Sequence, residues 1–197
     1  IAPVVTGTLT ASNTNGCSIA AAPAAMTTVT ALETAGLTIS DNCTADANLV
    51  VTSSDGTVSG TCPITFTRTY TIKDLCNRAS TATQTININD TSVPVVTGSL
   101  NTVSVNGCSI SDAPEAMTTV AALEAAGLTI SDNCTSDSNL VVTSSDGTAT
   151  GSCPITFTRT YTIKDACNRA STATQTITVQ DTTAPVISSL VESLDVT

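Results

Sequence analysis

The chain repeats itself with a period of 91 residues. The stretch TCPITFTRTYTIKDLCNRAS begins at Thr61 and returns at Ser152 with two residues changed. Four cysteines and a proline follow the same period: Cys17, Cys43, Cys62 and Cys76 return as Cys108, Cys134, Cys153 and Cys167, and Pro3 returns as Pro94 and Pro185. A fixed period of this kind is the signature of tandem structural units. The sequence therefore predicts a first copy at 1–91, a second copy at 92–182 and the start of a third at 183–197, as an excerpt of a longer array.

Charge and missing side chains exclude several function classes. The chain has a net charge of -10 and only six cationic residues, all inside the repeated stretch. Nucleic acid is not an expected partner, because its binding proteins need a basic surface. Histidine is absent, which removes the usual general base, and no acid pair of the kind glycosidases use stands out. We expect no enzyme, and no apolar run predicts insertion into a membrane.

The cysteines predict disulfides rather than a zinc site. Each copy has four cysteines, and the whole chain has two Phe and two Tyr, so the core is too poor in aromatic side chains to be generously stable. Small units of this composition usually need covalent support. The C-x2-C spacing of zinc sites is missing, since successive cysteines lie 26, 19 and 14 residues apart. Disulfides place the protein outside the cytosol.

Hydrophobic periodicity predicts a mainly β fold. Alternating apolar residues indicate one long half-buried strand at 64–73, a returning strand at 81–89, and shorter strands at 3–9, 37–40 and 48–56. A short amphipathic helix is expected at 24–35, where Met26, Val29 and Leu32 recur at three-residue spacing before Gly36. We therefore predict tandem immunoglobulin-like β-sandwich repeats, each with one short inserted α-helix and two disulfides.

Strand length restricts the pairing of the four cysteines within a copy. Cys62 and Cys76 lie at opposite ends of the long strand, and fourteen extended steps separate them by roughly 46 Å, far beyond the roughly 5.5 Å that a disulfide allows between Cα atoms. The preceding strand runs antiparallel, which brings Cys43 to the end where Cys76 lies. The predicted pairs are Cys43 with Cys76, Cys17 with Cys62, Cys134 with Cys167 and Cys108 with Cys153.

Arg68 and Arg159 lie on the apolar face of the long strand in each copy. A buried guanidinium needs a carboxylate partner. We predict a structural ion pair of Arg68 with Glu33 on the helix, and of Arg159 with Glu124, with Asp41 as the other available partner in the first copy. Ligand binding by these arginines is the alternative.

Four acids of the first copy, Asp41, Asp46, Asp74 and Asp90, return as Asp132, Asp137, Asp165 and Asp181. Asp90 lies in the linker between the copies, where it would meet the loops that carry Asp132 and Asp165. Converging carboxylates bind a hard cation such as calcium. The sequence thus predicts a calcium site of Asp90, Asp132 and Asp165 at the joint between repeats. The alternative is that these acids only form turns at strand ends.

The polar face of the long strand presents a row of threonines, Thr65, Thr67, Thr69 and Thr71, beside Thr81, Thr83 and Thr85 of the returning strand. A flat array of hydroxyl groups is a candidate surface for glycan or ice. Threonine is also a favoured strand residue on any solvent-facing surface, so the array has a purely structural explanation as well.

Three motifs together resemble a known family. The patterns are DNC at 41–43, TRTYTIKDLCNRAS at 67–80 and TQTININDTSVPVV at 83–96, with DTTAPV at 181–186. They are similar to the hyalin-repeat-like, four-cysteine immunoglobulin-type repeats of giant Bacteroidetes surface adhesins, most of all the SprB-type adhesins of gliding flavobacteria. The resemblance covers both copies. It implies a rigid stalk or adhesive filament at the bacterial cell surface, acting in attachment and gliding motility, with solid surfaces or polysaccharide and neighbouring repeats of the same chain as partners.

Overall fold

The computed structural model describes residues 1–187 and divides the chain into two compact units. Unit 1 comprises Ile1–Val95 together with two later segments, Ser131–Leu140 and Lys164–Ser171. Unit 2 comprises Val96–Ile130, Val141–Ile163 and the residues from Thr172 onward. Unit 1 therefore contains the whole first copy, the first four residues of the second copy and two later segments of the second copy. The domain boundaries expected from the repeat stay a prediction, and the residues beyond 187 in the expected third copy lie outside the described part.

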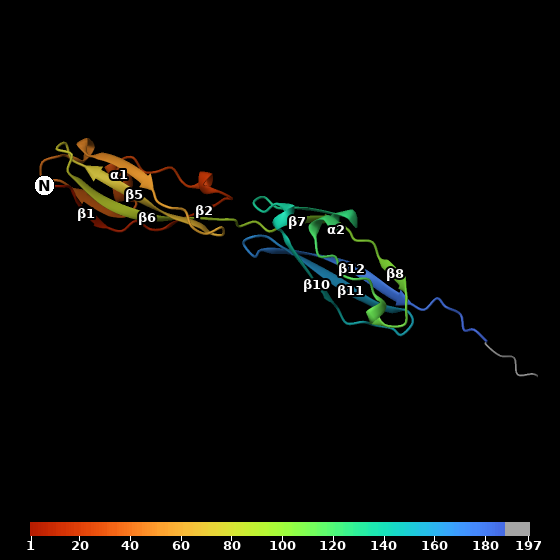
Figure 1. The fold of residues 1–197 in the computed structure, drawn as a ribbon. Helices are drawn as coiled ribbons and strands as arrows, with labels where there is room; N and C mark the ends of the chain where they lie inside the picture. Colours follow the sequence, from red (N-terminus) through yellow and green to blue (C-terminus); the bar gives the residue numbers. More distant parts are fainter. Residues whose placement is uncertain (188–197) are drawn as a thin grey trace, which may run out of the picture. The chain divides into compact units, whose positions relative to one another are not determined.

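The same order of elements occurs in both copies (Figure 1). In the first copy the elements are β1 (Val4–Gly7), β2 (Ser12–Asn15), α1 (Val29–Thr34), β3 (Leu37–Ser40), β4 (Val50–Asp55), β5 (Ile64–Lys73) and β6 (Ala79–Asn89). In the second copy they are β7 (Val95–Gly98), β8 (Val103–Asn106), α2 (Val120–Ala125), β9 (Leu128–Ser131), β10 (Val141–Asp146), β11 (Ile155–Lys164) and β12 (Ala170–Gln180). Four 3-10 turns complete the order: η1 (Ile19–Ala21), η2 (Asp46–Asn48), η3 (Ile110–Asp112) and η4 (Asp137–Asn139).

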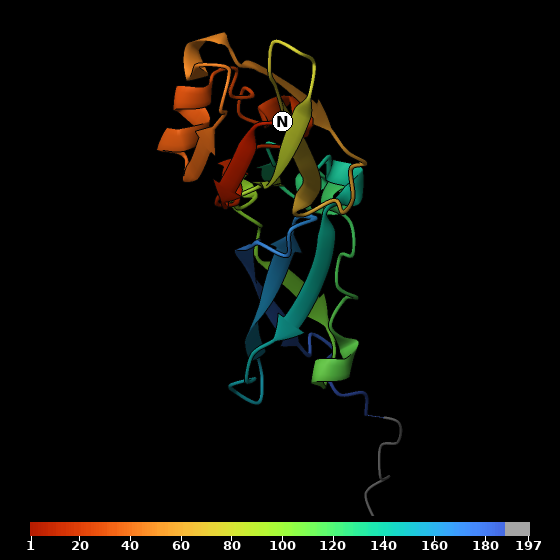
Figure 2. The ribbon, with the colours of Figure 1, turned by 90° about the vertical axis from the view of Figure 1, so that its left-hand side faces the viewer.

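Each copy forms a four-stranded and a two-stranded sheet. In the first copy the larger sheet has the order β2-β6-β5-β4, and β1 pairs with β3 in the smaller one. The second copy has the corresponding sheets β10-β11-β12-β8 and β7-β9. The long strands β11 and β12 are neighbours in this sheet and can be followed in both views (Figures 1 and 2). The expected mainly β architecture is confirmed.

The core of unit 1 lies between the two sheets and the helix. Tyr70 and Ile72 of β5 are buried against Leu32 of α1 and Leu37 and Ile39 of β3. Burial of a large apolar side chain contributes about 1.5 to 3 kcal/mol. The predicted strand at 64–73 has the bounds of β5, and its alternation places the apolar residues inward as expected. No helix in the described part of the chain is long and apolar enough to cross a membrane.

The helix is shorter than its hydrophobic spacing predicts. It begins at Val29, because the side chain of Thr28 accepts a hydrogen bond from the backbone N–H of Ala31 and acts as the N-cap. The residues before it are not helical, and the backbone N–H of Met26 donates instead to the hydroxyl of Tyr70. Only the second half of the expected segment at 24–35 therefore forms a helix.

Candidate metal centre

Three aspartates of unit 1 converge on one point. Asp90 follows β6, Asp132 follows β9 and Asp165 follows β11, and one carboxylate oxygen of each lies within 4.8 Å of the others. These are the three residues that the sequence predicts as a cation site. The structure therefore brings the predicted set together, and binding of an ion to it stays a prediction.

Hydrogen bonds from the backbone orient the two loop aspartates. The Oδ1 atom of Asp132 accepts from the N–H groups of Cys134 and Thr135, at 3.0 and 2.7 Å. The Oδ1 atom of Asp165 accepts from the N–H groups of Cys167 and Arg169, at 2.8 and 2.7 Å. Each bond lies within the loop that carries the aspartate, so the local sequence D-x-C fixes the carboxylate. Asp turns of this kind are local and need no tertiary partner.

The same two loops hold Asp90. Its Oδ1 atom accepts from the N–H of Ser92 at 3.0 Å and from the side-chain amide of Asn133 at 3.3 Å. Its backbone carbonyl accepts from Nε of Arg169 at 2.6 Å. Asn133 follows Asp132, and Arg169 closes the Asp165 loop, so both D-x-C loops contact the linker residue.

The loop after β11 is closed by two backbone hydrogen bonds. The N–H of Asp165 donates to the carbonyl of Arg169 at 3.0 Å, and the N–H of Asn168 donates to the carbonyl of Asp165 at 3.2 Å. Asn168 has a φ of 61°, a left-handed conformation that asparagine tolerates better than most residues. The turn thereby holds Arg169 and the Asp165 carboxylate on the side of Asp90.

The second carboxylate oxygen of each aspartate has no partner. The Oδ2 atoms of Asp90, Asp132 and Asp165 are buried and accept no hydrogen bond in the part of the chain that the structure describes. Asp90 and Asp165 are only 3% and 4% exposed. Two negative charges at 4.8 Å repel by roughly 3.5 kcal/mol at an effective dielectric constant of about 20. Three oxygens of this kind match the preference of a hard cation such as calcium.

Two disulfides flank the acidic cluster, and they differ from the predicted pairs. Cys17 is bonded to Cys134 and Cys62 to Cys167, with Cα atoms 4.9 and 5.3 Å apart. The predicted bridges within a copy are therefore wrong for these four cysteines, because each bond joins one copy to the other. The remaining four cysteines of residues 1–187 are exposed and carry no bridge, contrary to the predicted pairs that include them: Cys43, Cys76, Cys108 and Cys153.

Strand register explains why the bonds connect the copies. Asn15 at the end of β2 lies beside Asn89, and Ile64 at the start of β5 lies beside Ile88. Cys17 and Cys62 follow and precede these positions by two residues, so both lie next to Asp90. The loops that contact Asp90 bring Cys134 and Cys167 to the same place. The prediction located each cysteine at the correct end of the long strand but considered partners only within its own copy.

The arginine ion pair has a different carboxylate from the predicted one. Nε of Arg68 donates to Oδ1 of Asp55 at 2.6 Å and its Nη2 donates to Oδ2 at 2.9 Å, while Nη1 donates to the carbonyl of Pro23. The prediction considered only Glu33 and Asp41 as partners, whereas the β4–β5 register sets Asp55 directly opposite Arg68. Glu33 instead accepts from the N–H of Ile39.

The second copy has the same ion pair, so the predicted partner Glu124 is wrong there too. Arg159 pairs with Asp146 at 2.6 and 2.9 Å, and Glu124 accepts from the N–H of Ile130. In both pairs the hydrogen bond to the guanidinium lowers the pKa of the aspartate, with the arginine charge adding to the effect. Each pair joins two neighbouring strands of the larger sheet, β4 to β5 and β10 to β11, and lies outside the acidic cluster.

The threonine array has the predicted cross-strand arrangement. Thr67 lies opposite Thr85, Thr69 opposite Thr83 and Thr71 opposite Thr81, while Thr65 lies opposite Asn87 and donates to its side chain at 3.0 Å. Thr67 of β5 and the three threonines of β6 are exposed, whereas Thr65, Thr69 and Thr71 are half-buried. The register therefore forms the hydroxyl rows, and whether they bind anything stays a prediction.

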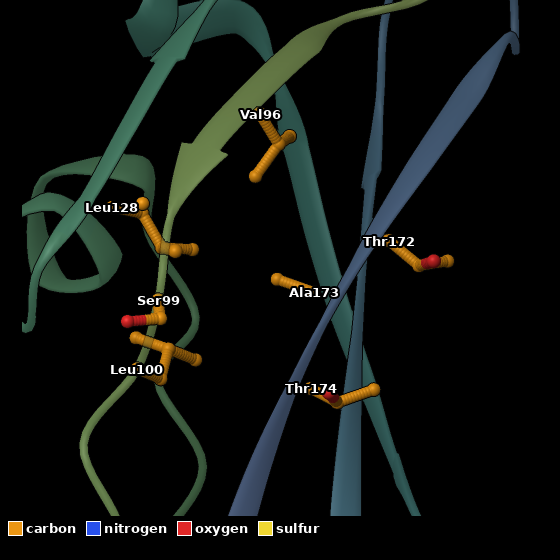
Figure 3. Close-up of a pocket in the computed structure, with 8 residues that line it drawn as sticks. Val96, Ser99, Leu100, Leu128, Thr172, Ala173 and Thr174 are labelled. Atoms are coloured by element: carbon orange, nitrogen blue, oxygen red, sulfur yellow. The ribbon is translucent and has the colours of Figure 1, made fainter.

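A shallow groove of about 260 Å³, lined by both apolar and hydroxyl side chains, lies beside the corresponding strand of unit 2. Figure 3 shows Ala173 of β12 turned towards Leu100 and Val96, with Thr172 and Thr174 on the opposite side of the strand. An equivalent groove in unit 1 includes Ala82 and Leu9. Threonines of the same strands also line the two grooves: Thr172 and Thr174 in unit 2, and Thr81 and Thr83 in unit 1.

Comparisons with known proteins identify no family. No protein-family model matches the chain, and no curated protein matches it. Among solved structures it is similar to Drosophila N-cadherin EC1-4, with a TM-score of 0.39, 8% identity and coverage of 92% of this chain and 50% of that chain. It is also similar to human mucin-like protocadherin EC1-2, with a TM-score of 0.35, 9% identity and coverage of 90% and 98%. The chain spans half the length of that N-cadherin fragment, and TM-scores this low carry no argument about function.

Proposed function

We propose that the chain is an extracellular repeat module of an adhesion-type protein, in which a calcium ion joins consecutive repeats. One observation carries this function: one carboxylate oxygen each of Asp90, Asp132 and Asp165 lies within 4.8 Å of the others, and the Oδ2 atom of each is buried and unpaired. Asp90 belongs to the linker and the other two belong to loops of the second copy. An ion bound to all three would therefore tie the linker to both loops.

The donor set favours calcium over transition metals. All three candidate ligands are carboxylates, which suit hard cations with oxygen ligands. The neighbouring thiols are used in disulfides, and the chain has no histidine, so the nitrogen and sulfur ligands typical of zinc are missing there. Calcium accepts six to eight oxygens, so water and backbone carbonyls would complete its shell.

The bound ion would act as a mechanical element. With the cation present, the mutual repulsion of the three carboxylates becomes attraction to a shared charge. The disulfides Cys17–Cys134 and Cys62–Cys167 hold the same loops covalently. Both devices resist separation of the loops from the linker, which suits a stalk or filament under load.

The finer proposal is a repeat of a giant bacterial surface adhesin that acts in attachment and gliding motility. It rests on the DNC and D-x-C motifs and on the resemblance that they carry. The disulfides support an extracellular location, because such bonds persist in oxidising compartments. The filament would hold adhesive chemistry away from the cell, with solid surfaces or polysaccharide as the contacted material.

Thermal unfolding with and without calcium tests the proposal. Unit 1 is expected to melt higher in calcium than in a chelator, by about 2.7 kcal/mol of stabilisation when calcium is 100 times its dissociation constant. Asp90→Asn should abolish the difference. Asp181→Asn is the matched control, because Asp181 occupies the same repeat position and lies outside the cluster. The calcium joint would be contradicted if calcium left the melting temperature unchanged, or if it raised the melting temperature equally in both variants.

A glycan- or ice-binding module is the second candidate, favoured by the cross-strand rows Thr67–Thr85 and Thr69–Thr83. Retention of the chain on agar and on ice would test it. Binding that falls when Thr67 and Thr69 are changed to Lys supports this function, whereas retention equal to that of an unrelated β-sandwich removes it.

A further inference from the structure

We propose that the four unbridged cysteines form two open halves of the same disulfide joint, and that each half accepts another repeat of this kind. One half consists of Cys43 and Cys76, and the other of Cys108 and Cys153. All four are exposed and carry no bridge in residues 1–187. The joint that is already closed, through Cys17–Cys134 and Cys62–Cys167, shows how such halves combine.

The loops of Cys43 and Cys76 have the geometry of the loops in the closed joint. Oδ1 of Asp41 accepts from the N–H groups of Cys43 and Thr44 at 3.0 and 2.7 Å, the same distances as in the Asp132 loop. Oδ1 of Asp74 accepts from the N–H groups of Cys76 and Arg78, both at 2.8 Å. These loops are thus preformed to receive a partner.

A second observation shows that this half lacks a partner. Oδ2 of Asp41 is buried without a hydrogen bond in the described structure, as Oδ2 of Asp132 is in the closed joint. Asp74 is 7% exposed. In the closed joint the equivalent aspartates face Asp90, a residue that follows the last strand of a copy. The open half therefore fits a partner that presents the end of another copy.

The end of the second copy presents the matching features. The N–H of Gly107 donates to the carbonyl of Gln180 at 3.2 Å, as Gly16 does to Asn89 at 3.2 Å. The N–H of Thr182 donates to Oδ1 of Asn106 at 2.9 Å, as Thr91 does to Asn15 at 3.0 Å.

The position of the thiols follows from these contacts. Asn106 lies beside Gln180 in the β8–β12 pairing, which sets Cys108, two residues later, next to Asp181. In the first copy the same register sets Cys17 next to Asp90. One of the substitutions between the two ends adds a local contact: Asp112 replaces Ala21, and its carboxylate accepts from the N–H of Cys108 at 2.8 Å.

The equivalence fixes which thiols pair. Cys108 corresponds to Cys17 and should bond to a cysteine of the Cys43 type, and Cys153 corresponds to Cys62 and should bond to one of the Cys76 type. Each bond forms from two thiols, which lose two protons and two electrons. A disulfide oxidant such as oxidised glutathione takes up the electrons by thiol–disulfide exchange and is released as two thiols.

Oxidation of the purified chain at high concentration in a glutathione buffer tests the inference. A ladder of disulfide-linked oligomers is expected on a non-reducing gel. Mass mapping of a mixture of 15N-labelled and unlabelled chains should find Cys108–Cys43 and Cys153–Cys76 bonds between copies. The four peptides are distinguishable, because each cysteine has different neighbours in the two copies, such as Leu75 against Ala166.

Two double variants give the control. Cys43→Ser with Cys76→Ser leaves only one kind of open half, as does Cys108→Ser with Cys153→Ser. Each variant alone should stay monomeric, and an equal mixture should stop at the dimer. Monomers throughout, Cys43–Cys76 bonds within one chain, or random pairing would overturn the inference. The test needs no calcium, so its failure and the failure of the calcium joint are distinguishable.

Discussion

The D-x-C loops of the two copies differ in their partners and agree in their local geometry. In the second copy, Asp132 and Asp165 face Asp90, and Cys134 and Cys167 are bonded. In the first copy, the same turns stand without a partner and their thiols are exposed. The comparison teaches that the D-x-C loops take up the same local geometry with or without a partner, and that the partner decides whether the loops form a closed joint.

The preformed geometry of the D-x-C loops lowers the entropic cost of binding a partner. Backbone N–H groups fix Oδ1 in both copies, so little conformational entropy remains to be lost when a partner arrives. A preformed half-joint therefore binds at a lower cost than a loop that must order first. The remaining requirement is charge neutralisation, which the proposed cation would supply.

Removal of the disulfides should give the largest effect and separates the closed joint from the open one. Cys17→Ser with Cys62→Ser removes bridges that span 117 and 105 residues. Loops of about 100 residues correspond to about 4.7 kcal/mol for the first bridge, and the second contributes less because it closes a loop that is already short. Calorimetry should show a lower melting transition for unit 1.

Cys108→Ser with Cys153→Ser is the matched control for that experiment. These residues carry no bridge in the described structure, so the melting of the monomer should be unchanged. Equal losses in both double variants would show that the difference between the closed and open joints has no bearing on stability.

The arginine pairs offer a test in which the two copies should behave alike. Asp55→Asn and Asp146→Asn each remove a bidentate partner from an arginine side chain that is only 7% or 8% exposed. Loss of a hydrogen-bonded charge partner costs about 2 to 3 kcal/mol. Urea unfolding should find similar losses for the two variants. A much larger loss in one copy would mean that its surroundings, and not the local pair, set the effect.

The pH dependence of stability should give the smallest effect. The pKa values of Asp55 and Asp146 are lowered by their arginine hydrogen bonds. The stabilisation is therefore fully present above about pH 4, the unfolded value, and is lost as pH falls through the lowered folded pKa. The unfolding free energy should decline below about pH 4, and less steeply in Asp55→Asn. An identical acid decline in wild type and variant would contradict this role.

Local and periodic features were predictable from the sequence. The alternation at 64–73 gave the bounds of β5, and the repeated acids identified Asp90, Asp132 and Asp165, because aspartates that follow strands gather at the ends of sheets. The threonine rows followed from the period of two. Each of these depends on contacts close in sequence or on simple strand geometry.

Choice among distant partners was not predictable. Arg68 had several acids within plausible reach, and only the β4–β5 register selects Asp55. Cys17 and Cys62 were placed at the correct end of the strand, but no pattern within a copy indicates that they bond to Cys134 and Cys167. The helix start depended on the cap of Thr28, which periodicity alone does not locate.

A crystal structure of the chain grown with calcium is the most direct measurement of the central claim. The account predicts one ion bound by Oδ2 of Asp90, Asp132 and Asp165, with oxygen distances of about 2.3 to 2.6 Å. The account would be contradicted if, in a crystal that contains calcium, water or the guanidinium of Arg169 contacted the three carboxylates in place of the ion.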